Sequence, residues 1–240
     1  PELAQAIVAA VKTGIRDWCN GATVRDCADT PRFIARLVEA RAAELPPACQ
    51  VRRAIPVSIK TRIGYEQPSV DVWIPQLLET GPAAIAVHGR TLRQAYGGHA
   101  DWDEIGRAAE LARGSGVLIL GNGDVSSRAE AERRSAEYGL DGVLIGRAAC
   151  GNPFVFEAPA AATAAAPDRY RTVRVAAEHA RLYAAAFGHL PYYCFLPMRK
   201  HLAWYVHHLP GANTLRRELL QVRSEAEAVA LLNDYLTYRS

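Results

Sequence analysis

Four short apolar runs, each ending beside a glycine, recur along the first two thirds of the chain. Runs of this kind are typical of strands that are buried on both faces, as in a parallel sheet that helices cover. We therefore predict four parallel strands, which lie within Ile55–Arg62, Ala83–His88, Val117–Leu120 and Gly142–Ile145.

Between these runs, apolar residues recur with helical spacing. Asp101 can cap a helix that begins at Trp102, and Ser126 or Ser127 can cap the helix that follows. One strand and one helix repeat about every 25–35 residues, which is typical of βα units in a barrel or a doubly wound sheet. The pattern predicts an α/β fold with helices at Val70–Glu79, Trp102–Arg113 and Ser127–Tyr138.

The chain changes character near residue 158. Ala158–Pro167 is rich in alanine and proline, which indicates a linker or a weak helix start. From about Asp168 onward the spacing is helical, and prolines divide this stretch into three or four helices. We therefore predict two domains, an α/β domain of residues 1–157 and a small helical domain of residues 158–240.

The stretch Gly14–Arg53 is the least informative part of the sequence. Within it, Arg32–Leu45 predicts an amphipathic helix, which Pro46 and Pro47 end. We assign no chemistry to this stretch.

The composition is that of a globular protein, since half of the residues are hydrophobic and 22% are charged. Apolar stretches end well before the roughly 18 residues that a membrane span needs, so we expect no span. The start shows no signal-peptide pattern, and its lack of an initiator methionine indicates that the sequence begins inside a longer protein. Five cysteines without CxxC spacing argue against a zinc site or a disulfide framework and favour reduced thiols in a cytoplasmic protein.

Polar side chains stand at the ends of all four predicted strands, beside glycines. Functional groups collect at the carboxyl ends of parallel strands, because the loops that follow converge there. The glycine-rich turns Gly121–Asp124 and Gly142–Arg147 offer backbone N–H groups to a phosphate, although tight βα turns alone would also need glycine. The strand-end side chains are Lys60, His88, Asn122 and Arg147.

Lys60 and His88 have two interpretations each. The Lys60 ammonium could stabilise negative charge on a reduced flavin ring or hold a substrate phosphate, or it could be a solvated strand-end lysine. The His88 imidazole could donate to a cofactor or substrate carbonyl or take part in acid–base chemistry. A hydrogen-bonded core histidine is the alternative for His88.

The formal net charge of +3 identifies no polyanion partner by itself, but the positive charge is concentrated in the last third of the chain. From Asp168 onward, ten basic residues stand against six acidic ones, and five of the seven histidines lie there. Cations can meet phosphates and aromatic rings can stack on bases, although a solvated helix face with Trp204 in the core is the alternative. The residues concerned are Arg199, Lys200, His201, Trp204, Tyr205, Arg216 and Arg217.

Several motifs occur in one order and at spacings that together resemble the tRNA-dihydrouridine synthases. The resemblance is specific because many motifs stay in register. It covers Val57–Phe156 and also Pro197–Leu236, where Arg199–His201 with Trp204 is similar to the family's C-terminal helical domain. The motifs of the first part are Lys60–Gly64, His88–Thr91, Tyr96–Trp102, Gly121–Asp124 and Gly146–Pro153.

The resemblance implies an FMN-dependent (β/α)₈ barrel, in which NADPH reduces the flavin and the flavin passes a hydride to C6 of a uridine in tRNA. The uracil is expected to leave its stack to reach the flavin. By the same resemblance, Lys60 and His88 match flavin-contacting residues. Two phosphate-binding turns are matched by Asn122, Gly123 and Asp124, and by Gly146 and Arg147. The RNA contacts are matched by Arg199, Lys200, His201 and Arg216.

The chain departs from the family in one respect. The family's proton donor is a cysteine in a motif resembling Asn-x-Gly-Cys-Pro, which does not occur in this sequence, so no catalytic residue is assigned. The opening Pro1–Leu3 resembles the helix after the family's fourth strand, so the expected fold is the C-terminal half of a TIM barrel followed by an all-α domain. Open sheet edges then predict that the chain alone is marginally stable, or self-associates, or is completed by a second polypeptide. Alternatives are a non-catalytic tRNA-binding fragment and an FMN-barrel oxidoreductase of the dihydroorotate-dehydrogenase type.

Overall fold

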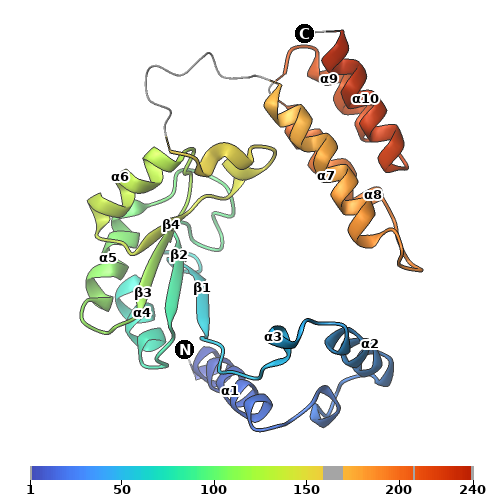
Figure 1. The fold of residues 1–240 in the computed structure, drawn as a ribbon. Helices are drawn as coiled ribbons and strands as arrows, with labels where there is room; N and C mark the ends of the chain where they lie inside the picture. The colour runs from blue at the N-terminus through green and yellow to red at the C-terminus, as the bar shows by residue number, and fades with distance from the viewer. Residues whose placement is uncertain (1, 159–169, 208, 239–240) are drawn as a thin grey trace. The chain divides into compact units, whose positions relative to one another are not determined.

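The computed structural model describes residues 2–158, 170–207 and 209–238 (Figure 1). The chain forms two compact units. The first contains Pro1–Gly123 and Ser135–Val143, and the second contains Asp124–Arg134 and Leu144–Ser240. The predicted domain boundary between residues 157 and 158 stays a prediction.

A four-stranded sheet forms the centre of the α/β part, and its strand order follows the chain (Figure 1). The pairs β1–β2 and β2–β3 are parallel, as the apolar runs predict. The first strand begins at Ser58 rather than at Ile55, since Pro56 has no amide hydrogen to donate to a ladder. The strands are β1 (Ser58–Arg62), β2 (Ala84–His88), β3 (Leu118–Asn122) and β4 (Gly142–Leu144).

The helices between the strands lie close to their predicted bounds. They are α4 (Val70–Leu78), α5 (Trp102–Ala112) and α6 (Arg128–Tyr138). The predicted cap of α5 is confirmed, because the Asp101 carboxylate accepts the Glu104 amide at 3.1 Å. Ser127 accepts the Glu130 amide at 3.2 Å, which identifies it as the serine that caps α6.

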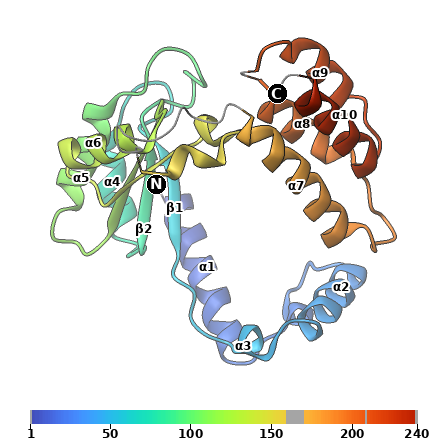
Figure 2. The ribbon, with the colours of Figure 1, turned by 45° about the horizontal axis from the view of Figure 1, so that its top comes forward.

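One face of the sheet is covered by α4 and α5, which lie side by side on it in both views (Figures 1 and 2). Side chains alternate between the faces of a strand, so every second residue of β2 and β3 enters this core. The fully buried residues here include Ile85, Val87, Ile119, Ile74, Leu77 and Ile105.

The segment before β1 is helical. It comprises α1 (Glu2–Cys19), η1 (Val24–Asp26), α2 (Arg32–Ala43) and α3 (Pro47–Gln50). The amphipathic helix predicted from Arg32 is confirmed as α2.

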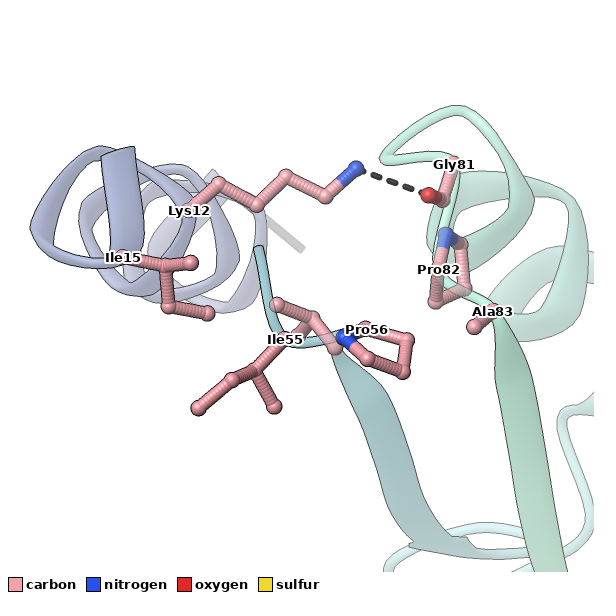
Figure 3. Close-up of a pocket in the computed structure, with 8 residues that line it drawn as sticks. Lys12, Ile15, Ile55, Pro56, Gly81, Pro82 and Ala83 are labelled. Atoms are coloured by element: carbon pink, nitrogen blue, oxygen red, sulfur yellow. Dashed lines mark hydrogen bonds between the residues drawn. The ribbon is translucent and has the colours of Figure 1, made fainter. Parts of the chain in front are cut away.

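Helix α1 is tied to α4 at the amino-terminal end of β1 and β2 (Figure 3). The Lys12 ammonium donates to the carbonyl oxygens of Thr80 and Gly81, the latter at 2.7 Å, just beyond the end of α4. A cation is favourable there, because the last carbonyls of a helix carry partial negative charge. A hollow of about 280 Å³ lies beside Lys12, Pro56 and Pro82. It is at the opposite end of these strands from Lys60 and His88, so it is separate from the predicted site.

From Leu144 onward, the described residues of the second unit form two short 3₁₀ turns and a module of four helices. The turns are η2 (Arg147–Ala149) and η3 (Pro153–Phe156), and the helices are α7 (Arg171–Phe187), α8 (Leu196–Tyr205), α9 (Ala212–Leu219) and α10 (Glu225–Thr237). Prolines and helical spacing predicted three or four helices, which these four confirm. The predicted linker at 158–167 lies, apart from Ala158, outside the described residues. The apolar core of the module includes Val173, Phe195, Met198, Leu202, Leu215 and Leu232.

Within the described ranges, no helix combines the length and hydrophobicity that a membrane crossing requires. The same part of the chain holds no cluster of three or more potential metal ligands of the His, Cys, Asp and Glu types. All five cysteines are free thiols.

Candidate functional site

Strand register brings three polar side chains into one row at the carboxyl ends of β1, β2 and β3. His88 pairs with Arg62 on one side and with Asn122 on the other. The chain beyond each strand continues this alignment, since the Ile63 amide donates to the His88 carbonyl at 3.1 Å and the Gly89 amide donates to the Asn122 carbonyl at 3.0 Å. The strand ends therefore lie side by side, as the sequence predicts for parallel strands.

Lys60 lies on the same face of the sheet as this row, because it precedes Arg62 by two residues. Thr61 points to the opposite face, where its hydroxyl accepts the indole N–H of Trp73 at 2.8 Å. The Lys60 ammonium donates to the Thr61 carbonyl at 3.1 Å. Partial desolvation, and then repulsion from Arg62, lower the pKa of Lys60. Together, Lys60, Arg62, His88 and Asn122 form a polar, cation-rich edge, which we call the strand-end row.

Two arginines hold the loop that follows β2. The Arg62 guanidinium donates to the carbonyls of Thr91 and Ala95 at 2.9 and 3.2 Å. Arg90 is only 2% exposed, and its guanidinium donates to the Gly97 and Gly98 carbonyls at 3.2 and 2.7 Å. One nitrogen of Arg90 also lies 3.5 Å from Nε2 of His88. The loop backbone is thus fixed close to the histidine.

Sequence reasoning missed both arginines as parts of the site. A signal existed for Arg62, since the alternation of side chains along a strand places it on the face of Lys60. Arg90 gave no such signal, because its carbonyl partners belong to a loop whose path the sequence does not specify.

Gly123 directly follows the row and must be glycine for two reasons. Its φ of +141° belongs to a region that side chains with a Cβ rarely adopt. A Cβ there would also lie 2.4 Å from the Ala100 Cβ and 3.5 Å from the His88 ring. The chain therefore makes a close turn beneath His88 that only glycine permits.

The remaining predicted turn residues belong to the second unit. The Arg147 guanidinium pairs with the Asp124 carboxylate at 2.7 Å. Gly146 precedes η2, and no described atom lies within 4 Å of the place that a Cβ would take. The turn thus leaves space at Gly146 beside the Arg147 guanidinium, which stays exposed while it pairs with Asp124.

The helical module carries a cluster of rings on α7 and α8. His201 lies between Trp204, in an edge contact at 5.0 Å, and His179, at 5.8 Å between ring centroids. The Lys200 ammonium lies 5.9 Å from the Trp204 ring centroid, and the Tyr205 hydroxyl is 3.2 Å from Nδ1 of His179. Burial, followed by the charge of Lys200 and the proximity of His179, lowers the pKa of His201. We call these five residues the α8 cluster.

Arg199 and Arg216, also predicted to contact RNA, have different surroundings. The Arg199 guanidinium donates to the Val222 carbonyl at 2.7 Å and to the Gln221 carbonyl at 3.0 Å, both in the segment between α9 and α10. Arg216 is exposed in the last turn of α9. Arg199 thus bonds to the backbone between α9 and α10, whereas Arg216 faces solvent; the RNA contact of each stays a prediction.

Comparison with known proteins gives consistent results. A sequence profile of the family described as dihydrouridine synthase matches residues 29–239. A probable tRNA-dihydrouridine synthase of Mycobacterium tuberculosis is 37% identical over 186 residues, which are 75% of this chain and 47% of that protein. Probable tRNA-dihydrouridine synthase 1 of Synechocystis sp. is 30% identical over 190 residues, covering 76% of this chain and 52% of that protein. The probable enzyme of Aquifex aeolicus is 42% identical over 103 residues, or 43% of this chain and 32% of that protein. The chain spans about half the length of the first two of these curated relatives.

Proposed function

Because this chain belongs to the dihydrouridine synthase family, we propose that it takes part in the NADPH-driven, FMN-dependent reduction of uridine to 5,6-dihydrouridine in tRNA. The observation that carries this proposal is the strand-end row, where Arg62, His88 and Asn122 share one register position beside Lys60. We place the reaction in the cytoplasm, where free thiols like those of the five cysteines persist.

The residues present fit FMN, whose ring has hydrogen-bond acceptors and whose side chain ends in a phosphate. In the proposal, Lys60 and His88 face the ring: the ammonium stabilises negative charge, and the imidazole donates a hydrogen bond. The turns at Gly123–Asp124 and Gly146–Arg147 hold the phosphate through backbone N–H groups and the Arg147 guanidinium. When bound, FMN supplies the hydride-transfer chemistry.

The proposal extends to the fold and its boundaries. We propose that the four strands are part of a (β/α)₈ barrel whose interior is the face of Lys60 and His88, since α4 and α5 cover the other face. Residues 1–157 then form the barrel portion, and residues 158–240 form the tRNA-binding portion. Strands beyond this sequence, in the same or a second polypeptide, would complete such a barrel.

A second candidate function rests on the cysteines. None of the five lies in a motif resembling Asn-x-Gly-Cys-Pro, so we assign the proton donor to no residue of this chain. A non-catalytic tRNA-binding role is therefore the second candidate. The family assignment favours both roles over a flavoprotein of the dihydroorotate-dehydrogenase type.

The flavin part of the proposal is tested by comparing FMN with riboflavin, which lacks the phosphate. We expect the chain to bind FMN at least about ten-fold more tightly, because charge-assisted bonds to the phosphate are lost in riboflavin. Arg147→Gln should reduce the ratio of the FMN affinity to the riboflavin affinity. Arg113→Gln, which replaces an exposed arginine at the end of α5, should leave this ratio unchanged. Titration followed by flavin fluorescence measures both affinities. Equal affinities in the unmodified chain would contradict the proposal.

The RNA part of the proposal is tested by the salt dependence of tRNA binding. A Lys200→Gln, Arg216→Gln double variant should bind all tRNAs more weakly and lower the slope of log affinity against log salt by about two, one for each lost phosphate contact. Arg199→Gln should instead lower the free energy of unfolding by about 1–3 kcal/mol, since it leaves the Gln221 and Val222 carbonyls without this donor. Filter binding and thermal unfolding separate the two effects. An unchanged salt slope in the double variant would refute the assignment of these cations to RNA.

A further inference from the structure

The turn between β4 and the helical module makes an unusually close backbone contact at Gly151. This residue is buried and has a φ of +79°. A Cβ at Gly151 would lie 2.3 Å from both the carbonyl carbon and the oxygen of Trp204, and 2.7 Å from the Tyr205 amide nitrogen. Real Cβ atoms do not approach backbone so closely, so any side chain here would force the turn and α8 apart.

A second contact fastens the same turn to α7. The Arg171 guanidinium at the start of α7 lies 3.4 Å from the centroid of the Phe154 ring. The same guanidinium forms two hydrogen bonds to the Glu157 carboxylate, at 2.7 and 2.9 Å. Planar stacking and a bidentate pair both fix orientation. The turn is thus held at two points, one on each of two helices.

Backbone hydrogen bonds also follow one another along the turn. Ala149 donates to the Gly146 carbonyl at 3.0 Å, Cys150 to the Arg147 carbonyl at 3.0 Å, and Asn152 to the Ala149 carbonyl at 3.2 Å. These three bonds restrict the backbone between Arg147 and Gly151. At the other side of the contact, Trp204 belongs to the α8 cluster, with His201 and Lys200 beside its ring.

We propose that Gly151 is a positioning residue, which lets the turn dock directly on the backbone of α8 and so fixes Arg147 relative to the α8 cluster. The ligands assigned to Arg147 and to the α8 cluster, a flavin phosphate and RNA, rest on the proposed function. The contact between the turn and α8, which we call the joint, does not depend on it. A fixed spacing means that the protein loses less conformational freedom when it binds a ligand that contacts both Arg147 and the α8 cluster. The absence of a side chain at Gly151 therefore keeps the two proposed binding surfaces aligned.

Hydrogen exchange of the full chain, without ligands, tests the joint. Gly151→Ala should raise amide exchange rates by at least about ten-fold in two separate segments, residues 147–157 and 203–207. Each segment shields amides of the other from water in the unmodified chain, and the substitution removes this protection. The matched control is Gly116→Ala, whose φ of +77° imposes the same backbone strain but which has no described atom within 4 Å. Faster exchange in 147–157 alone, or in neither segment, would overturn the proposal.

A second pair of variants keeps the test decisive if Gly151→Ala fails to fold. Arg171→Gln should raise exchange in both segments and leave exchange in β2 and α5 unchanged. Arg171→Lys should restore only a small part of the protection, because lysine keeps a cation beside Glu157 but neither the planar stack on Phe154 nor the bidentate pair. General loss of folding would instead raise exchange throughout the chain, β2 and α5 included. In the same variants, tRNA affinity should follow the exchange pattern. If the unmodified chain did not bind tRNA, the proposed function would be refuted. The exchange rates would still test whether Gly151 holds the turn on α8.

Discussion

Replacing Lys60 with methionine should weaken FMN binding by about ten- to hundred-fold. Hydrogen bonds to charged groups are worth about 1.5–3 kcal/mol, and the ammonium is the cation of the strand-end row that the proposal directs at the flavin ring. Methionine keeps most of the length of the side chain, so the loss would come from the charge and its hydrogen bonds. Flavin fluorescence titration at neutral pH measures the effect.

The control for this variant is Lys12→Met, one of only two other lysines in the chain. The Lys12 ammonium bonds to the Thr80 and Gly81 carbonyls at the opposite end of the strands. Its loss should therefore affect stability and leave the FMN affinity unchanged. Equal FMN affinities of Lys60→Met and the unmodified chain would remove Lys60 from the site.

The lowered pKa of Lys60 adds a pH dependence with a definite sign. The ammonium is present below its pKa and is lost as the pH rises through it. Because this pKa is lowered from 10.5, FMN affinity should begin to fall at a pH below that value. Lys60→Met has no group to lose in this range, so the difference in affinity between the two proteins should shrink as the pH rises.

The elements that local sequence determines were the predictable part of the fold. The helices α4, α5 and α6 follow from helical spacing and from caps such as Asp101, which act within a few residues. The alignment of the carboxyl ends of β1, β2 and β3 was also predictable, because parallel strands that helices connect end at the same edge of the sheet. The row of Arg62, His88 and Asn122 is the result.

Contacts between distant backbone segments were the unpredictable part. Arg199 stands in a sequence pattern typical of nucleic-acid contacts, yet its guanidinium bonds to carbonyls at residues 221 and 222. Nothing near Arg199 in the sequence indicates that these carbonyls need a donor. Gly151 belongs to a motif whose glycine is visible, but the reason for it, the approach of Trp204, arises from a helix more than fifty residues away. Side-chain identity is local information, whereas such docking depends on the tertiary fold.

Gly123→Ala is expected to reduce both stability and FMN affinity. Holding a residue with a Cβ at a φ of +141° costs about 1–3 kcal/mol of strain. The new methyl group would in addition clash with the Ala100 Cβ, at 2.4 Å, and any shift of the turn that relieves this clash would occur in van der Waals contact with the His88 ring, which is 3.5 Å from the Cβ position. Since His88 and the turn at Gly123 both belong to the proposed flavin site, FMN affinity should fall about ten-fold or more, which corresponds to about 1.4 kcal/mol.

Gly139→Ala separates strain from displacement. Gly139 also has a positive φ, of +63°, but no described atom lies within 4 Å of the place that its Cβ would take. An alanine there should cost about 1–2 kcal/mol in thermal unfolding and leave the FMN affinity unchanged, because left-handed backbone is strained but nothing is moved. If both variants lost the same stability and neither lost FMN affinity, the close approach at Gly123 would have no role in the flavin site. A selective loss in Gly123→Ala would instead tie FMN affinity to the turn beneath His88.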